Sequence, residues 1–401
     1  MTFRWVTVLA LVVAAARSAA ASPIAIASGG DLPADLIIDP ERGILRSGDV
    51  EVSLRYLLIH EPADPEDGCE VRFAGARYDR AADALELDEP GCTGGAITIP
   101  RRRVVAVLSR ARGRAAEARR DLPEAQRHLA AALAGEPDNE EIALDLARVQ
   151  LTRGNGADAM ATLRPFIALA PIAHYAAYLS TPGFAPLLDD PQLAGLRAKA
   201  PGSAQVHGVG SRLAAHSATH ELFAAIHEVP IGDPCQGARR DVALAILDRS
   251  GHTVTSFSLL PPQLVEEEWT DRDVRTHADE IAARIATANR FLRDLGFEPA
   301  GDVVPFAMNA QGSQVARFTK AHLGVAERDG TLRLLKGNRT LGQHHLYRCP
   351  HDRFACEYPP TLRWAAWLPS LRVVLLGWES SGAEHSDRTA AIDVWKLRAP
   401  R

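Results

Sequence analysis

The architecture of this chain is set by two consecutive segments of equal length: AVLSRARGRAAEARRDLPEAQRHLAAALAGEPDN (residues 106–139) and EEIALDLARVQLTRGNGADAMATLRPFIALAPIA (residues 140–173). When the two segments are aligned over 34 residues, small and apolar residues recur at the same places. The matched positions are Gly113, Ala125, Leu129 and Pro137 in the first segment and Ala147, Ala159, Leu163 and Pro171 in the second. A period of this length is typical of stacked helical hairpins, so the stretch predicts two α-hairpins that pack on each other.

Each segment also carries its own helix boundaries. Pro123 stands where a second helix begins, a position at which the missing N–H costs nothing. Gly154-Asn155-Gly156 supplies the corresponding turn in the second segment. We expect the eight matched residues to form the packing contacts within and between the hairpins, since small side chains let two helices approach closely.

These residues resemble the tetratricopeptide repeat family, over about residues 106–196 including a divergent closing segment. The chain departs from the family in its first helices, where an aromatic position is taken by Ala116 and Gln150. The period then breaks, because a third unit would place Pro182-Gly183 inside a helix. The resemblance implies a stack of helices that binds another protein or a peptide on its concave face. Candidate partner-facing residues are Arg110, Arg112, Glu117 and Gln150.

The first residues predict export. Arg4 is followed by an apolar run from Trp5 to Ala16, and Ala19-Ala20-Ala21 offers a cleavage site before Ser22. No later run reaches the roughly 18 apolar residues of a membrane helix, so we expect no integral membrane segment after cleavage. Cleavage would remove two arginines and change the formal charge from −5 to −7, which disfavours nucleic acid as a partner. Few Lys and abundant Ala are typical of a GC-rich bacterial genome.

Five cysteines fit an oxidising compartment. Cys69 and Cys92 bracket an expected strand–turn–strand over residues 70–87, and Cys349 and Cys356 close a short loop. We expect these two pairs to form disulfides, which leaves Cys235 over; an odd number of thiols keeps other pairings open.

The remaining sequence predicts an α+β fold with several domains: a small disulfide-linked β region, a short array of α-hairpins, and a carboxy-terminal antiparallel sheet with one long helix. The expected segments are a signal peptide (1–21), a β-rich region with a strand at 50–59 (22–100), helical repeats with their closing segment (101–200), a linker and short helix (201–240), and an α+β domain (241–401). In the last, Thr270 is expected to cap the long helix, and Asp329-Gly330 predicts a hairpin.

Two histidine groups have spacings that metal sites use. We expect residues 211–228 to be helical, and His216 and His220 would then share one face of the helix. His344, His345 and His351 lie close to Cys349 and Cys356, where a zinc site and a disulfide are alternatives. Each group also has a structural interpretation that involves no metal: a polar helix face for the first group and a disulfide loop for the second. We favour the structural interpretation for both groups.

No sequence signature identifies a reaction. The chain has no G-x-S-x-G, no phosphate-binding P-loop and no HExxH motif, and we expect no cofactor. Our leading prediction is an exported bacterial protein that binds or scaffolds other proteins in the cell envelope, periplasmic or secreted. One alternative is an envelope hydrolase, with or without a metal ion, in which a histidine lies beside a carboxylate in the carboxy-terminal domain. A second alternative is a carbohydrate-binding module built on exposed tryptophans among Trp364, Trp367, Trp378 and Trp395, although core packing is the simpler role for these rings.

Overall fold

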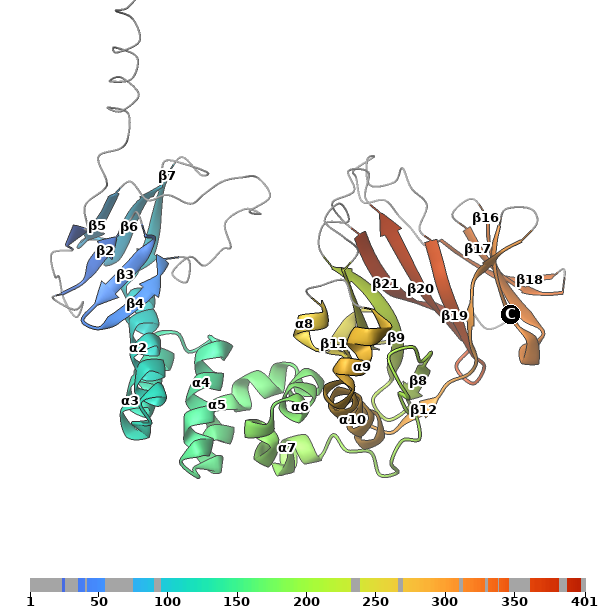
Figure 1. Cartoon of the computed structure of the whole chain (residues 1–401), viewed down its shortest axis with the longest axis horizontal. Coiled ribbons are helices and arrows are strands. Elements are labelled where there is room, and N and C mark those ends of the chain that lie inside the picture. The colour runs from blue at the N-terminus through green and yellow to red at the C-terminus, as the bar shows by residue number, and fades with distance from the viewer. Residues whose placement is uncertain are drawn as a thin grey trace, which may run out of the picture. The chain divides into compact units, whose positions relative to one another are not determined.

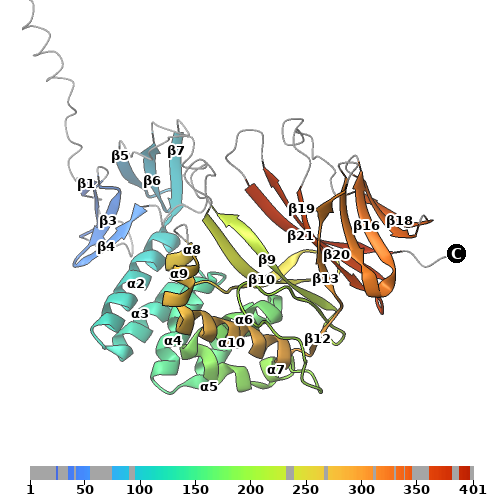
Figure 2. The same ribbon diagram turned by 45° about the vertical axis from the view of Figure 1, so that its right-hand side comes forward.

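The structure is a computed structural model that describes residues 24–25, 35–39, 42–54, 75–89, 95–231, 239–265, 270–309, 313–328, 331–337, 339–345, 361–381 and 388–397. The chain divides into two compact units, Met1–Leu169 and Ala170–Arg401. Figure 1 and Figure 2 show both units from two directions. Among the described residues, no helix combines the length and the apolar character needed to cross a membrane.

The described strands that precede the repeats form two antiparallel sheets, with the orders β1-β2-β3-β4 and β5-β6-β7. The strands are β1 (Ile24–Ala25), β2 (Ile37–Asp39), β3 (Ile44–Ser47), β4 (Val50–Ser53), β5 (Gly75–Asp79), β6 (Ala84–Glu89) and β7 (Gly95–Pro100). The expected hairpin is confirmed as β5 and β6, and β4 covers the start of the strand expected at 50–59. All five cysteines lie outside the described residues, so both disulfides stay predictions.

Four helices follow in the first unit: α2 (Arg101–Ala118), α3 (Leu122–Gly135), α4 (Glu140–Thr152) and α5 (Gly156–Leu169). Their boundaries follow from local chemistry. The Asp121 carboxylate accepts from the Glu124 N–H at the start of α3, and the Asn139 side chain accepts from the Ile142 N–H at the start of α4. The two predicted α-hairpins are thereby confirmed as α2–α3 and α4–α5.

Close approach within the first hairpin depends on Gly113. A Cβ atom added there would lie 2.6 Å from Leu129 Cγ, well inside van der Waals contact. Leu129 and Ala125 are fully buried, as are the equivalent Leu163, Ala159 and Ala147 of the second segment. The helices of the first hairpin therefore touch at a spacing that any larger residue at Gly113 would disturb.

The first half of α2 completes the core of the β region. Val104 and Leu108 of α2 are buried in one cluster with Leu36, Leu45 and Leu87 of the strands. The second half of α2 packs against α3 through Ala116. In both views α2 begins beneath the strands of the blue sheets (Figures 1 and 2). One helix thus belongs to two cores, that of the β region and that of the repeats.

The second unit begins with the closing segment, which contains α6 (Pro171–Ser180), the 3-10 helix η3 (Pro182–Asp189) and α7 (Pro191–Ala194). The two short helices η3 and α7 are separated by Asp190 alone. Buried Tyr175 of α6 donates from its hydroxyl to Asp294 Oδ2 at 2.9 Å, and Asp294 ends α10 (Ala278–Asp294). The closing segment is therefore held against the main helix of the second unit.

The rest of this unit contains three antiparallel sheets, where the sequence had predicted one. The helix-side sheet has the order β11-β10-β9-β8-β12, the central sheet β13-β19-β20-β21, and the outer sheet β14-β15-β16-β17-β18. The helix-side strands are β8 (Ala214–Ser217), β9 (Leu222–Ile231), β10 (Arg239–Leu247), β11 (Thr253–Ser258) and β12 (Phe297–Pro299). The central strands are β13 (Val303–Pro305), β19 (Thr361–Leu368), β20 (Val373–Ser381) and β21 (Arg388–Lys396). The outer strands are β14 (Ala307–Met308), β15 (Gln314–Phe318), β16 (Leu323–Arg328), β17 (Thr331–Lys336) and β18 (Arg339–His345), with the short 3-10 helix η5 (Thr319–Ala321) after β15.

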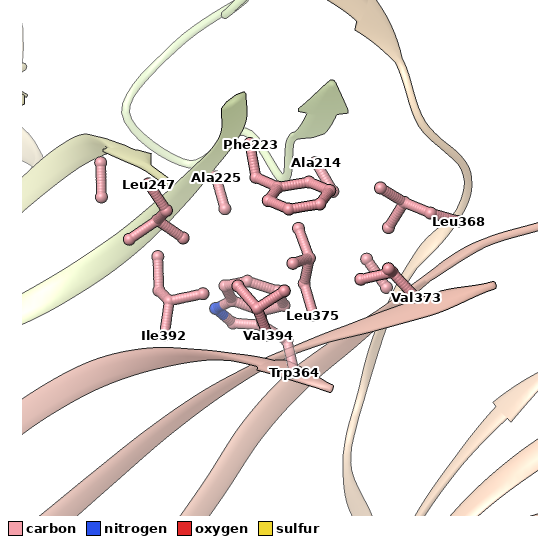
Figure 3. Close-up of a cluster of buried hydrophobic side chains, with 12 residues drawn as sticks. Ala214, Phe223, Ala225, Leu247, Trp364, Leu368, Val373, Leu375, Ile392 and Val394 are labelled. Atoms are coloured by element: carbon pink, nitrogen blue, oxygen red, sulfur yellow. The ribbon is translucent and has the colours of Figure 1, made fainter. Parts of the chain in front are cut away.

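The central sheet is buried on both faces. Along β20, Val373 and Leu375 pack toward the helix-side sheet, while Val374 and Leu376 pack toward the outer sheet, as the period-2 geometry of a strand requires. Figure 3 shows the first of these cores, in which Phe223 and other helix-side residues face side chains of the central sheet. Figure 2 shows the strands of the three sheets in the same order. Because each face of the central sheet has its own apolar cluster, the sheets stack as three layers.

Helices cover the far face of the helix-side sheet. The Phe291 ring of α10 lies 5.0 Å from the Phe257 ring of β11. The predicted long helix is divided in two, because Thr270 caps α9 (Asp271–Thr276) and α10 starts after a break at His277. A further short helix, α8 (Pro262–Val265), lies against β10.

The prediction that residues 211–228 form a helix is wrong. These residues form β8 and β9, joined by a turn in which Glu221 takes the left-handed conformation with φ 58°. Residues 222–226 are buried on both faces of the sheet, so they lack the alternation by which a half-exposed strand is identified. Within the segment expected as a linker, Ala204 and Val206 are buried. The Ala204 N–H donates a hydrogen bond to the Phe297 carbonyl oxygen, and the Val206 N–H donates one to Asn289 Oδ1.

Candidate functional site

A row of charged side chains crosses from α2 to α4 on one face of the repeats. Arg110, Arg114 and Glu117 succeed each other at helical spacing on α2, and Glu141, Asp145 and Arg148 do so on α4. Spacings of four and three residues place each trio on one side of its helix. We call these six residues the charged face. Arg114 and Arg148 are 34 positions apart and thus occupy the same place in the two repeats.

Asp145 is the centre of the charged face. Its Oδ2 accepts from Arg110 Nε and Arg114 Nε, both at 2.8 Å, and its Oδ1 accepts from Arg148 Nη2 at 3.1 Å. Only 4% of the Asp145 side chain is exposed. Burial by itself raises the pKa of Asp145, but hydrogen bonds from Arg114 and Arg110 outweigh it and leave the pKa below the ordinary value. The carboxylate is therefore ionised at neutral pH and fixes three guanidinium groups.

The guanidinium groups differ in how far they reach solvent. Arg110 is mostly buried and also donates to Glu141 Oε2 at 2.6 Å. Arg148 makes a two-pronged pair with Glu117, at 2.9 and 2.8 Å. Arg114 is 53% exposed and Arg148 43% exposed, and no described residue accepts a hydrogen bond from Nη1 of either. The charged face thus presents two preoriented guanidinium groups with N–H donors to spare.

Two of the four partner-facing candidates lie on this face, namely Arg110 and Glu117. Arg112 instead donates to Ser47 Oγ of the β region at 2.7 Å. Gln150 is buried and accepts from Thr162 Oγ1 of α5 at 3.1 Å. Sequence reasoning missed Arg114, Glu141, Asp145 and Arg148. The sequence does contain a signal for them: the two helices carry charged residues at the same spacing, and each charge on α2 has a charge of opposite sign at the same step of the series on α4.

The first histidine group does not form a shared helix face. His216 lies on β8 and packs on Phe223, with ring centroids 5.2 Å apart. His220 lies in the following turn, where its Nε2 is 2.7 Å from the Leu196 carbonyl oxygen. Burial and the nearby Arg249 charge lower the pKa of His216. Since residues 214–217 form a strand, the four-residue spacing no longer places the two imidazoles on one side of a helix.

The histidines of the second group do not lie together, and one of them, His344, is paired with a carboxylate. His344 of β18 lies on the inner face of the outer sheet, and its Nε2 is 2.6 Å from Asp393 Oδ2 of β21. Because a carboxylate only accepts, Nε2 is the donor in this pair, and in the neutral form of the ring Nδ1 is then the acceptor. The imidazole stacks on the Trp395 ring at 5.4 Å. His345 is the next residue on the same strand and therefore points to the opposite face, and His351 lies outside the described residues.

The tryptophans of the last strands are core residues. Trp364 and Trp395 are buried, on opposite faces of the central sheet, and Trp367 and Trp378 are partly buried beside Trp395. These four rings do not form the exposed platform that a carbohydrate-binding module needs. Glu266–Glu268 lie outside the described residues. Within the described ranges, no three His, Cys, Asp or Glu side chains come together as metal ligands would.

Comparison with known proteins agrees with the helical part of the chain. The family model of the tetratricopeptide repeat matches residues 112–177. No curated protein and no solved structure matched the chain. The matched range contains the end of α2 from Arg112 onward, the three repeat helices that follow it and the start of the closing segment. It includes the whole charged face apart from Arg110.

Proposed function

We propose that residues 112–177, as tetratricopeptide repeats, make this chain a scaffold that binds a partner protein through the charged face. Repeats of this family generally mediate protein–protein interaction. The observation that carries the proposal is the pair Arg114 and Arg148, equivalent in the two repeats and both held by Asp145. Their remaining N–H groups suit carboxylate oxygens, so the partner is expected to present acidic side chains or a chain terminus.

The test uses the full-length protein and exposed arginines only. Partners that co-purify from the native organism are identified by mass spectrometry, and the affinity of the principal one is measured for the wild type and variants. We expect Arg114→Gln and Arg148→Gln each to weaken binding about tenfold, the loss of one charge-assisted hydrogen bond. Arg127→Gln is the matched control, because Arg127 is exposed on α3 and paired only within that helix. Equal affinity of all variants would exclude the charged face as the binding site.

We also propose that the protein acts outside the cytoplasm, in the envelope or beyond the cell. The support is the leader-like sequence of residues 1–21 and the four cysteines that the sequence places in two candidate disulfide pairs. Sequencing the amino terminus of the native protein is expected to find Ser22, and a chain that still begins at Met1 would contradict export. Alkylation without reduction is expected to modify one thiol, with four more exposed after reduction.

One observation favours a second candidate function, an envelope hydrolase with His344 as general base. The His344–Asp393 bond fixes the tautomer that leaves Nδ1 as a proton acceptor, which is the role of the carboxylate in acid–base dyads. Any ester hydrolysis by the purified protein, assayed with p-nitrophenyl acetate, is then expected to be lost in His344→Gln and kept in His345→Gln. Activity equal in both variants would remove this candidate.

A further inference from the structure

His227 carries a partly buried imidazole whose Nδ1 atom has no hydrogen-bond partner among the described residues. It lies on β9, directly across from Ala243 of β10, on the same face of the helix-side sheet as Phe223 and Ala225. Those two residues belong to the core between the helix-side and central sheets (Figure 3). The Nδ1 atom of His227 is buried, and no described residue forms a hydrogen bond with it. Buried polar atoms without partners are rare, so this one needs a physical account.

We propose that His227 is an acid-sensitive point in the packing between the helix-side and central sheets, where a proton on the imidazole weakens the contact and loosens the second unit. The neutral ring tolerates this environment because one nitrogen can remain a bare acceptor. The protonated ring has donors on both nitrogens, and the Nδ1–H would be buried without an acceptor while the ring carries a charge. Opening the contact to water relieves both costs.

The charged groups around His227 do not offset that charge. On β10, Asp241 lies on the same face two residues from Ala243, but it already accepts from Ser258 Oγ at 2.8 Å, and burial raises the pKa of Asp241. On β8, His216 occupies the same face, and acid would add a second positive charge there. Glu228, on the opposite face of β9, pairs with Arg240.

The packed central sheet does not supply a counter-charge either. Glu379 of β20 lies on the face toward the helix-side sheet, two residues beyond Gly377, but it is already paired with Arg363. Asp393 of β21 lies on the far side of the central sheet, bonded to His344. Cationic residues begin and end this strand, Arg388 and the exposed Lys396. Protonation of His227 therefore creates a positive charge that no carboxylate among the described residues of the neighbouring strands neutralises.

The direction of the pH effect follows from burial. Burial lowers the pKa of His227 in the folded protein, whereas an unfolded histidine titrates near about 6.5. Between the folded and unfolded pKa, the unfolded chain holds one more proton. Stability is therefore complete above about pH 6.5 and falls as the pH drops below it, by up to about tenfold in the unfolding equilibrium constant per pH unit.

The experiment compares denaturation of the full-length protein at pH 7.5, 6.5 and 5.5. Tryptophan fluorescence reports the second unit, because five of the six tryptophans lie within residues 170–401. The variants are His227→Phe, which keeps a flat ring, and His227→Gln, which keeps polar atoms but cannot charge. His252→Gln is the control, since the His252 side chain is 86% exposed.

Below pH 6.5, we expect the unfolding equilibrium constant of the wild type and of the His252 variant to rise by up to about tenfold more per pH unit than that of either His227 variant. NMR titration of the His227 ring in the folded protein is expected to show a midpoint below about 6.5, the value of an unperturbed histidine. The same pH slope in all four proteins, or a His227 midpoint at or above about 6.5, would overturn the proposal. Should His227→Phe not fold, the glutamine variant and the titration still decide the outcome.

Discussion

Asp145 organises the charged face from an interior position. It accepts hydrogen bonds from three arginines, and one of them, Arg110, has only 16% of its side chain exposed. A buried ion pair adds little stability relative to an apolar pair, but removing one partner leaves an unpaired charge. The charged face is therefore held together by a residue that a partner protein hardly touches.

Asp145→Asn is expected to lower the free energy of unfolding by about 3 kcal/mol, because Arg110 would keep its charge in a mostly buried site. The measurement is urea denaturation followed by circular dichroism at the helix band. Glu124→Gln is the control, since the exposed pair of Glu124 with Arg127 contributes little to stability. A loss no larger than that of the control would contradict the central role of Asp145.

Acid provides a second readout of the same residue. The pKa of Asp145 lies below its unfolded value, chiefly because hydrogen bonds from Arg114 and Arg110 outweigh burial. The stability that this carboxylate contributes is thus complete above about pH 4 and is lost as the pH falls further. We expect the wild type to lose more stability than Asp145→Asn between pH 5 and pH 3, and parallel curves would be inconsistent with a lowered pKa.

Whether Gly113→Ala stabilises or destabilises the repeats depends on the space around the added Cβ atom. Alanine favours helix over glycine by about 1 kcal/mol, but a Cβ at Gly113 would lie 2.6 Å from Leu129 Cγ in a closed core. Overpacking costs about 1–3 kcal/mol, so Gly113→Ala is expected to destabilise the repeats by about 1 kcal/mol overall. Gly156→Ala is the matched control, because nothing lies within 4 Å of its added Cβ. Thermal denaturation should separate the two, and a stabilised Gly113→Ala would show that α2 and α3 can move apart.

At the scale of helices and strands, the sequence predicted those elements whose ends are marked by capping residues, prolines or turn residues. The repeat helices were predictable because small residues, prolines and caps recur at fixed spacing. The β16–β17 hairpin was predictable from Asp329-Gly330 between two apolar runs. β8 and β9 were not, because their residues are buried on both faces and show no alternation. The division into three sheets depends on pairs distant in sequence, such as Val303 with Ala366, which local patterns do not record.

The link between α6 and α10 yields an element-scale prediction. Tyr175→Phe removes the hydroxyl that donates to Asp294 and keeps the ring contact with Phe291. We expect a loss of about 2 kcal/mol in the free energy of unfolding, as for one hydrogen bond to a charged group. A double-mutant cycle with Asp294→Asn isolates the pair. Coupling near zero would mean that apolar packing alone holds the closing segment.

At the scale of the whole chain, the charged face could be predicted only in part. Arg110 and Glu117 were identified from their helix, while Asp145 was missed because its role depends on α4 lying beside α2. The His344–Asp393 pair joins residues 49 positions apart and needs two packed sheets. Contacts of this kind arise from tertiary packing, and a single sequence does not display them.

The shared helix α2 leads to a prediction about fragments. A fragment of residues 22–169 retains both cores of α2, whereas residues 101–169 leave Val104 and Leu108 without the strands that cover them. Two repeats are also fewer than the three that such arrays usually need. We expect the longer fragment to melt cooperatively and the shorter one to melt at a much lower temperature, as measured by circular dichroism. Equal melting temperatures would show that the β region does not support the repeats.

The position of α2 in two cores also bears on the order of events during synthesis. Leu36, Leu45 and Leu87 are made before Val104 and Leu108, yet all five share one buried cluster. The first hundred residues therefore leave the ribosome with an open apolar face that only the following helix can close. A ribosome that paused before about residue 110 would hold an aggregation-prone intermediate, and one that passed this point would release both regions to fold together.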